Sequence, residues 1–435
     1  YRVLLADVED VYDEFNGGLP SSDAIKRFIK YGHDHWGVEF VLLVGDGQED
    51  HKQLYYDPLP YRGSPPDFNP PRSICIAVPD PDYDDEVVSS DNWYSFLDPG
   101  EVSALPSDGT EGMLLQAYGY PDVFVGRFPV GEDIELVALV TTLKRFVDPD
   151  ISDTWRRNIV LLADDAWSGA GDYYSYKPWE REFEWSIGRT GDQIEASLPG
   201  GFDITTVNLA RWTDGAHDID ETGTEPYSEA EDSTRAYCTP YLMRHLNEGC
   251  LLFTFQGHAA RANLAKEAPF ATLGQYSDQD SLRSRLPLLF TGFGCHISEF
   301  ARLSELSRGA EGENGDCLSE QLLFKPGSGA VGTYASSAFE YLDQNSVFCE
   351  RLHREIFQSP PTDSVPPENE YTGAHWIFAE AITKGLIEHM DASAYGMDQA
   401  IRYTILGDPM LKIDPGPPVM RLEADWGEGW RAIDP

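Results

Sequence analysis

The hydrophobic positions in the second half of the chain fall into short unbroken runs, the pattern of strands buried on both faces of a parallel sheet. Segments with the spacing of amphipathic helices separate several of these runs. Because parallel strands need crossover connections, we predict a mostly parallel sheet flanked by helices. Five strands are expected, in RRNIVLLADD (156–165), FDITTVNLAR (202–211), CLLFTFQGH (250–258), LPLLFTGFGC (286–295) and GAVGTYASS (329–337).

Helices are expected between and after these strands, and a last strand closes the unit. The helical segments are WEREFEWSIGRTGDQIEASL (179–198), DCLSEQLLF (316–324) and HWIFAEAITKGLIEHM (375–390), and the closing strand lies in ILGDPMLKI (405–413).

The first 150 residues follow the same alternation. Strands are expected in YRVLLADV (1–8), EFVLLVGDG (39–47), SDNWYSFLD (90–98) and PDVFVGRFPV (121–130), with helices at 21–36, capped by Ser21 or Ser22, and 132–146.

A proline and acidic turn formers in VDPDISDTW (147–155) indicate a junction between two units. We therefore predict two tandem α/β subdomains, residues 1–152 and 153–415. The composition changes after Pro415, so residues 416–435 are expected to be a linker or the opening of a further module.

Two of the apolar runs end in reactive side chains. His258 follows Gly257 at the end of one run, and Cys295 follows Gly294 at the end of the next, 37 residues later. One crossover helix fits that interval, so the two strands are expected to be neighbours. The side chains would then meet at the carboxyl edge of the sheet, where the catalytic groups of open α/β sheets collect.

A thiol beside an imidazole is the pairing of a cysteine nucleophile with its base. The backbone N–H groups of Cys295 and Gly257 are candidates for the oxyanion hole. His296 is a rival base, ranked lower because consecutive residues of an extended segment point in opposite directions. Asp164 and Asp165 end a strand at the same edge and are candidates for orienting the imidazole, with an acidic turn as the alternative.

Charge and composition narrow the classes of partner. The chain has 32 Lys and Arg against 74 Asp and Glu, a formal net charge of −42. Such a surface repels nucleic acid and anionic membranes, which excludes them as expected partners. It would attract basic substrates, bind Ca²⁺ or keep the protein soluble. No stretch approaches the roughly 18 apolar residues that a membrane span needs.

The cysteines and the amino terminus give further expectations. Six cysteines without C-x-x-C spacing predict neither a disulfide framework nor a zinc site. Tyr1 begins without the charged and apolar regions of a signal peptide, so we expect a mature or excised fragment whose targeting signal is missing.

The chain also resembles the gingipain-like cysteine peptidases of family C25, whose catalytic domain is caspase-like. Besides the two strand ends, matching segments follow in the family's order over most of residues 1–415. They are VYDEFNGGLPSSDAIKRFIKY with EFVLLVGDG, SSDNWYSFLD, PDVFVGRFPVGEDIELVALVTTLKRF, SEQLLFKPGSGAVGTYASS and ILGDPMLKI.

The resemblance implies a cysteine endopeptidase that works through a thioester acyl-enzyme and needs no cofactor for catalysis. The family's catalytic dyad falls on His258 and Cys295. Its imidazole-orienting acid falls on Asp164 or Asp165, within a loop that extends to Asp172.

The family also implies where a substrate would bind. The acid that directs the best-known members to cut after Arg or Lys corresponds to Glu180, Glu182 or Glu184, with the first two preferred. Glu340 and its neighbour Tyr341 are further candidates for the substrate pocket. Ala259 departs from the family, which commonly has glycine after the histidine, and it puts the specificity in doubt.

Location and accessory features follow from the same resemblance. Family members act on protein or peptide substrates outside the cell or at its surface, and they bind structural Ca²⁺. The Asp-rich segment DPDYDDE (80–86) is compatible with such a site. Known members are also followed by an immunoglobulin-like module, for which residues 416–435 would be the start, and contact with or removal of a propeptide is expected.

Two other functions compete with the peptidase. A sortase-like transpeptidase of the same fold would pass the same thioester to an amine rather than to water. A non-catalytic surface or adhesion module would keep the fold without the chemistry, although both His258 and Cys295 are intact.

Overall fold

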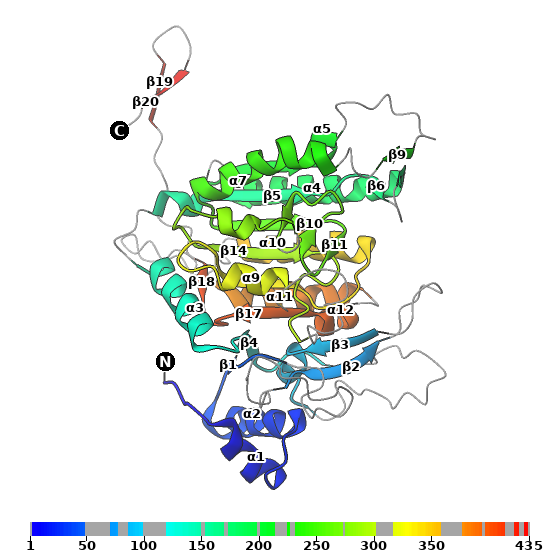
Figure 1. Ribbon diagram of the computed structural model, residues 1–435. Helices are drawn as coiled ribbons and strands as arrows, with labels where there is room; N and C mark the ends of the chain where they lie inside the picture. The colour runs from blue at the N-terminus through cyan, green and yellow to red at the C-terminus, as the bar shows by residue number, and fades with distance from the viewer. Residues whose placement is uncertain are drawn as a thin grey trace.

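In the computed structural model of the chain, the described residues are 2–47, 70–76, 86–98, 119–148, 153–168, 173–197, 201–213, 224–226, 231–272, 275–301, 316–357, 376–393, 396–413, 422–425 and 430–433. Figure 1 shows how these elements are arranged around one central sheet.

Eight strands form that sheet. In spatial order they are β1 (Phe40–Val44), β4 (Phe124–Phe128), β17 (Tyr403–Gly407), β15 (Ala330–Ser336), β14 (Leu288–Phe293), β10 (Leu252–Gln256), β5 (Asn158–Ala163) and β8 (Asp203–Asn208). The five strands from β15 to β8 run parallel to one another, whereas β17 is antiparallel to β15. Strands β4 and β1 continue parallel to β17. The predicted mostly parallel sheet is therefore confirmed.

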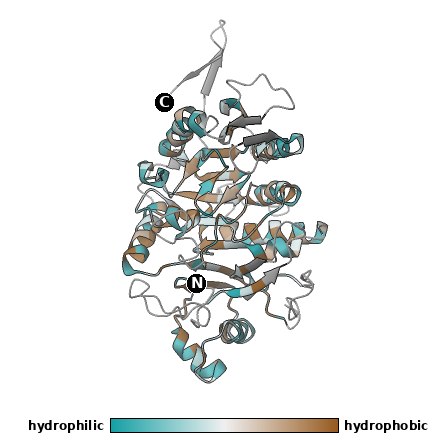
Figure 2. Cartoon of the chain, turned by 45° about the vertical axis from the view of Figure 1, so that its right-hand side comes forward, coloured by the Kyte–Doolittle hydropathy of each residue, from teal (hydrophilic) through white to brown (hydrophobic). Residues whose placement is uncertain are grey.

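Helices pack on both faces of the sheet, because its strands carry apolar side chains on both faces. Ile159 and Leu161 of β5 belong to one buried core, whereas Val160 and Leu162 belong to the other. The first core is covered by α4 (Glu182–Ser197), α10 (Leu342–Phe357), α11 (Phe378–Ala392) and α12 (Gly396–Arg402). The second is covered by α3 (Asp133–Phe146), α7 (Thr239–Glu248) and α9 (Leu318–Leu323). Figure 2 shows the strands as mostly apolar and the outer helix surfaces as polar.

Shorter elements complete the fold. Helices α1 (Val8–Asn16) and α2 (Ser22–Trp36) precede β1, and α2 begins as predicted with a cap at Ser21, whose side chain accepts from the Asp23 amide. Small helices are η1 (Asn92–Ser95), η2 (Asp153–Arg157), η3 (Pro178–Arg181), α5 (Ala210–Thr213), η5 (Thr234–Cys238) and η6 (Asp278–Ser281).

Besides the main sheet, the described residues form five small sheets. Three of them have two strands each: β2 (Arg72–Ile76) with β3 (Glu86–Ser90), β16 (Trp376–Ile377) with β18 (Lys412–Ile413), and β19 (Leu422–Asp425) with β20 (Trp430–Ile433). The other two have three strands each, in the spatial orders β6 (Trp167–Ser168), β7 (Tyr173–Tyr176), β9 (Thr224–Pro226) and β11 (Ala259–Ala260), β12 (Asn263–Leu264), β13 (Phe270–Ala271).

The strand predicted over residues 1–8 is wrong. Residues 2–7 have no regular secondary structure, and α1 begins at Val8 with its N-cap at Asp7. Val3 and Leu5 are 90% and 94% exposed, and none of the described strands pairs with them. An apolar run without a partner strand has nothing to satisfy its backbone groups in a ladder.

The strand predicted over SDNWYSFLD is also wrong. Strand β3 ends at Ser90, and the next residues form η1. The reason is Asp91, whose carboxylate binds the Arg127 guanidinium of β4 through two hydrogen bonds, at 2.5 and 2.7 Å. The buried pair turns the chain at this point and ends the strand.

The connection between β10 and β14 differs from the predicted crossover helix. Its described residues form β11, β12, β13 and η6 instead of an α-helix. Ala265 and Ala268 have positive φ angles of 50°, and Pro269 follows directly, so the backbone cannot continue helically here.

The division of the chain into subdomains of residues 1–152 and 153–415 stays a prediction. Strands β1 and β4, from the first predicted subdomain, belong to the same sheet as the later strands.

Candidate active site

Three adjacent strands deliver the candidate catalytic residues to one edge of the sheet. Strand β10 pairs in parallel with β5 on one side and with β14 on the other, in a register that matches Gln256 to Ala163 and to Phe293. Because the three strands end level with one another, the residues that follow them emerge side by side. The adjacency of the β10 and β14 strands, predicted from the sequence, is confirmed.

Two glycines allow the strand ends to approach one another. A Cβ atom on Gly257 would lie 2.2 Å from the Cβ atom of Asp164, which is well inside contact distance. A Cβ atom on Gly294 would lie 2.6 Å from the Gly257 carbonyl oxygen. The segments that carry His258 and Cys295 are therefore in close backbone contact, which residues with a side chain would prevent.

Asp164 holds the backbone of the histidine rather than its ring. Its Oδ2 atom accepts from the His258 amide at 2.8 Å, and its Oδ1 atom accepts from the Asp165 amide at 2.9 Å. Burial raises the pKa of Asp164 to about 6, against the lowering effect of the His258 charge and of these two hydrogen bonds. The carboxylate fixes where the histidine backbone lies.

Asp165 forms a local turn. Its Oδ1 atom accepts from the Trp167 amide at 2.8 Å, and the residue is buried. This geometry matches the alternative interpretation of the acidic pair as a turn. Asp172, the far end of the loop considered from the sequence, lies outside the described residues.

The imidazole of His258 is bound by Glu180. Its Nε2 atom lies 3.3 Å from Glu180 Oε1, and its ring meets the edge of Phe183, with ring centres 5.4 Å apart. Burial lowers the pKa of His258, but the hydrogen bond to Glu180 and the charges of Asp164 and Glu180 outweigh it, so the pKa is raised. The site therefore favours the imidazolium.

Glu180 itself is buried, with only 5% of its surface exposed. It lies in η3, three residues before Phe183, so both side chains reach the histidine from the start of α4. Besides the imidazole, its Oε1 atom lies 3.8 Å from Lys177 Nζ. Its Oε2 atom is buried and has no hydrogen-bond partner among the described residues.

The other two glutamates of this region do not share that position. Glu182 pairs with Arg189, which also contacts Glu350 at 2.7 Å. Glu184 is half-buried on α4. Of the carboxylates considered from the sequence, Glu180 is the one that contacts the imidazole, a position that the sequence had assigned to an aspartate after β5.

Cys295 is held by the backbone of the segment after β15. Its Sγ atom accepts from the Glu340 amide at 3.3 Å and lies 3.8 Å from the Glu340 carbonyl oxygen, to which the thiol donates. The thiol is partly buried. A backbone N–H directed at sulfur stabilises a thiolate, because the partial positive charge of the amide faces the negative charge.

The backbone of Glu340 lies beside the thiol, but the carboxylate of Glu340 is engaged in the interior. Its Oε1 atom accepts from the Ser336 hydroxyl at 2.6 Å, and its Oε2 atom accepts from Gln399 at 3.5 Å. Burial raises the pKa of the Tyr341 phenol, whose ring lies 5.6 Å from the Arg402 guanidinium. The side chain of Glu340 thus anchors the segment that contacts Cys295.

One oxyanion-hole candidate is wrong. The Gly257 N–H donates to the Phe293 carbonyl oxygen at 3.1 Å, as part of the contact between the ends of β10 and β14. A donor used in this way cannot also bind a substrate oxygen. The contribution of the Cys295 N–H to an oxyanion hole stays a prediction.

His296, the rival base, is engaged by a carboxylate. It has a positive φ of 59°, and its Nδ1 atom lies 3.4 Å from Glu299 Oε2.

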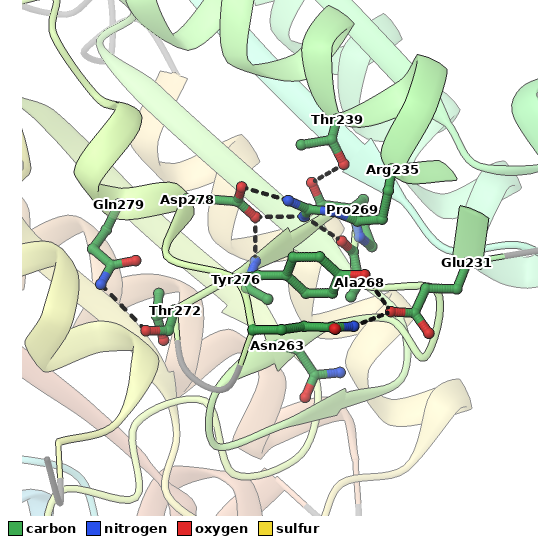
Figure 3. Close-up of polar contacts among 12 residues, drawn as sticks. Glu231, Arg235, Thr239, Asn263, Ala268, Pro269, Thr272, Tyr276, Asp278 and Gln279 are labelled. Carbon is green, nitrogen blue, oxygen red and sulfur yellow. Dashed lines mark hydrogen bonds and ion pairs between the residues drawn. The ribbon is translucent and has the colours of Figure 1, made fainter. Parts of the chain in front are cut away.

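A polar cluster holds the segment that follows His258 against η5 and α7 (Figure 3). Arg235 binds both oxygens of Asp278 at 2.6 and 2.8 Å and donates to the Ala268 carbonyl oxygen at 2.9 Å. The guanidinium lies 3.9 Å from the Tyr276 ring, and the Tyr276 hydroxyl donates to Glu231 at 2.7 Å. This cluster, named here the Arg235 cluster, had no signal in the sequence.

Within the described ranges, no group of three or more His, Cys, Asp or Glu side chains is arranged to hold a metal ion. Residues 80–85 of the Asp-rich segment considered for Ca²⁺ lie outside those ranges. The thiols of Cys238, Cys250, Cys317 and Cys349 are buried, and that of Cys295 is partly buried. None of the described helices is long and apolar enough to cross a membrane.

Comparisons with known proteins agree with this geometry. The model of a family described as Peptidase family C25 matches residues 1–414. The sequence gave no match among curated proteins. Among solved structures, the crystal structure of the Arg-specific cysteine proteinase gingipain R (RgpB) superposes with a TM-score of 0.55 at 15% identity, over 93% of this chain and 75% of that chain.

Two further structures share the fold at similar distance. The complex of Porphyromonas gingivalis RgpB pro- and mature domains gives a TM-score of 0.53 at 16% identity, over 93% of this chain and 76% of that chain. A structure described as a protease gives 0.55 at 13% identity, over 93% of this chain and 72% of that chain. At these identities the likeness shows the caspase-like fold.

Proposed function

This chain belongs to peptidase family C25 and is a cysteine-type peptidase, and from that premise we propose that Cys295 is its nucleophile and His258 its general acid and base. The observation that carries the proposal is the register of β10 and β14, which brings the two residues to equivalent positions at one sheet edge. The raised pKa of His258 adds support, because an imidazolium is the acid that a leaving amine requires.

The proposed reaction has two steps. The Cys295 thiolate attacks the carbonyl carbon of the scissile peptide, and the imidazolium of His258 gives a proton to the amine as the C–N bond breaks. Water, deprotonated by the imidazole, then attacks the thioester and releases the acid. The Glu340 amide, 3.3 Å from Sγ, would stabilise the thiolate between turnovers. The Cys295 N–H is the proposed donor to the oxyanion.

Asp164 is proposed to act on the backbone in this reaction. It accepts a hydrogen bond from the His258 amide, so it fixes the position of the backbone from which the imidazole extends, without touching the ring. Gly257 supports the same arrangement, because its lack of a side chain makes room for the Asp164 carboxylate.

We propose that the peptide is cut after basic residues. Glu180 is a buried carboxylate next to His258, and its Oε2 atom has no hydrogen-bond partner among the described residues. The formal charge of −42 would attract cationic peptides to the protein. The gingipain R of the similar crystal structure is described as Arg-specific, which agrees with this choice.

The protein is proposed to act outside the cell or at its surface, and to be made with a pro-domain. The support is the similar structure in which the pro- and mature domains of RgpB form a complex. Structural Ca²⁺ and a further module after residue 415 remain part of the proposal, and neither is needed for the chemistry.

The test is cleavage of a peptide library with every P1 residue, for the wild type beside Cys295→Ala. Loss of a nucleophile costs about 10⁶ in kcat where it has been measured, so the variant should be inactive. Cleavage after Arg or Lys would support Glu180 as the acid that recognises the P1 side chain, whereas cleavage after other residues would leave the peptidase and exclude basic specificity. An added amine acceptor reveals transpeptidation as a new product. No turnover and no reaction of Cys295 with an alkylating reagent would contradict the proposed mechanism.

A further inference from the structure

Two adjacent polar residues near the start of α10, Asn345 and Ser346, are buried in the core beneath the ends of the central strands. A helix face that packs on a sheet is usually apolar, and a polar residue is buried there where its hydrogen bonds are made. The hydrogen bonds of these two residues lead in two directions. One set reaches the segment beside Cys295, and the other reaches the strand that ends before His258.

The first set of bonds connects Asn345 with the thiol. Asn345 Oδ1 accepts from Gln399 Nε2 at 2.8 Å, and the same nitrogen lies 3.5 Å from Glu340 Oε2. The other carboxylate oxygen of Glu340 accepts from the Ser336 hydroxyl at 2.6 Å. The Glu340 side chain is therefore held from both sides, and the amide of the same residue donates to Cys295 Sγ at 3.3 Å.

The second set of bonds connects Ser346 with the histidine. The Ser346 hydroxyl accepts from Gln256 Nε2 at 2.7 Å, and Gln256 is the last residue of β10, two positions before His258. The Gln256 carbonyl oxygen accepts from the Asp164 amide at 2.9 Å, and Asp164 binds the His258 amide. The end of β10 is thus fixed through its backbone by the segment after β5 and through its side chain by α10.

The residues that make these bonds lie in the core, where hydrogen bonds are strong. They are exposed by 7% or less, and we name them here the Asn345 cluster: Asn345, Ser346, Gln256, Gln399 and Glu340. The Tyr403 hydroxyl of β17 also donates to Asn345 Oδ1, at 2.9 Å, and the Ser186 hydroxyl of α4 donates to the Ser346 carbonyl oxygen, at 3.1 Å. In such surroundings, loss of one partner leaves the other unsatisfied, so the cluster has a defined geometry.

We infer that the Asn345 cluster positions the catalytic pair: it ties the backbone donor of the Cys295 thiolate and the strand end that carries His258 to one point on α10. This inference rests on the proposed function. The thiol and the imidazole come from separate strand ends, and a misplacement of about 1 Å can cost on the order of 10²-fold in rate. The cluster acts on the reaction through Cys295 and His258, because its side chains are buried in the core.

A second polar link on the same helix is a matched control. His353, about two turns further along α10, lies 2.8 Å from the Thr254 hydroxyl, which lies 2.8 Å from the Thr291 hydroxyl. Thr254 and Thr291 are register partners within β10 and β14. This link joins the same helix to the same two strands, but away from the edge that carries the dyad. Burial lowers the pKa of His353 to about 4, so its ring stays neutral near pH 7.

Two variants break the cluster, one in each direction. Ser346→Ala removes the hydroxyl that binds Gln256, and Gln399→Met removes the amide donor but keeps the length of the side chain. In both, kcat for the best P1 peptide should fall about 10-fold or more with KM nearly unchanged, because the dyad is displaced and the groups that bind substrate are not. Ser346→Thr restores the hydroxyl and should recover most of kcat. Thr254→Val should unfold at lower urea concentration and keep the wild-type kcat.

A second readout needs no turnover. The rate at which iodoacetamide alkylates Cys295 is measured against pH in the wild type, in Gln399→Met and in Thr254→Val. Displacement of the Glu340 amide removes a donor that stabilises the thiolate, so the profile of Gln399→Met should move to higher pH. The profile of Thr254→Val should match that of the wild type.

The outcomes separate this inference from the proposed function. Wild-type kcat in Ser346→Ala, together with a wild-type alkylation profile in Gln399→Met, would overturn the inference and leave the peptidase intact. A loss of kcat in Thr254→Val as large as in those two variants would also overturn it, because the effect would then belong to the core as a whole. A wild type that neither cuts peptides nor is alkylated at Cys295 would refute the proposed function, and the inference with it.

Discussion

Two charged clusters hold the chain between His258 and β14, and they are built in opposite ways. In the Arg235 cluster, Asp278 binds a guanidinium with both oxygens and accepts the Ala271 amide as well, so its bonding capacity is used by fixed partners (Figure 3). At the start of the segment, Glu180 binds a titratable imidazole with one oxygen, and its other oxygen is buried without a hydrogen-bond partner among the described residues.

The difference separates a structural pair from a functional one. Arginine stays charged at any physiological pH and its planar donors match a carboxylate, so the Arg235 pair is suited to hold a loop in place. An imidazole changes its charge near neutral pH and can exchange protons with a substrate. The Glu180 carboxylate beside it raises the pKa of that imidazole, whereas the Asp278 carboxylate binds a group that stays charged.

The largest expected effect comes from breaking the functional side. His258→Ala removes the proposed proton donor, and the rate of peptide cleavage should fall by about 10²- to 10⁴-fold while the protein stays folded. Cleavage of the best P1 peptide is the measurement. His296→Ala tests the rival base, and a loss as large as that of His258→Ala would reverse the assignment.

Breaking the structural side should cost stability instead. Asp278→Ala strands the Arg235 guanidinium in a mostly buried position, which is expected to lower the free energy of unfolding by about 3 kcal/mol. Urea unfolding of the variant beside the wild type measures this. The alkaline limb of the pH–rate profile should not move, because the guanidinium pair does not contact His258, and a shift of that limb would show the two clusters to be coupled.

The third effect is a pH dependence that belongs to Asp164. Its pKa is raised from 3.8 to about 6, so the folded state favours its protonated form. The contribution to stability is therefore fully present below pH 3.8 and is lost as the pH rises through about 6, with about 3 kcal/mol as the upper bound. In Asp164→Asn, this part of the pH dependence of the free energy of unfolding should vanish. Urea unfolding of both proteins between pH 4 and 7 checks it, and parallel curves would contradict the assignment.

The smallest expected effect lies at the rim of the Arg235 cluster. Tyr276→Phe removes one hydroxyl and its 2.7 Å hydrogen bond to Glu231 but keeps the ring under the guanidinium. A loss of about 1 kcal/mol in the free energy of unfolding is expected, with wild-type kcat. A loss as large as that of Asp278→Ala would mean that the cluster is held together by the tyrosine rather than by the ion pair.

The sequence predicted the elements that local pattern controls. The central strands, the parallel order of β10 and β14, the Ser21 cap and the two strand-end residues follow from apolar runs, glycines and capping chemistry. The strand predicted for residues 1–8 failed because a strand needs a partner, and pairing is not a local property. The predicted crossover helix failed where Ala265 and Ala268 adopt positive φ before Pro269.

Side-chain contacts in the site were harder to predict, because they depend on how elements approach one another. Asp164 was a candidate for orienting the imidazole and Glu180 for binding the substrate, but the aspartate binds the histidine backbone and the glutamate binds its ring. The close approach at Gly257 decides this, since it brings Asp164 against the backbone. The Glu340 amide at the thiol had no side-chain signal at all.

The most direct test of the proposed Cys295–His258 dyad is to identify the thiol that reacts in the folded protein. Burial raises the pKa of Cys238 and of Cys250 to about 12, and it also raises the pKa of Cys317 and Cys349. Mass spectrometry after brief iodoacetamide treatment at mildly acidic pH should find Cys295 modified and these four unmodified, with the modification slowed in His258→Ala. Modification of a buried cysteine in preference to Cys295, or equal rates with and without His258, would contradict the proposed dyad.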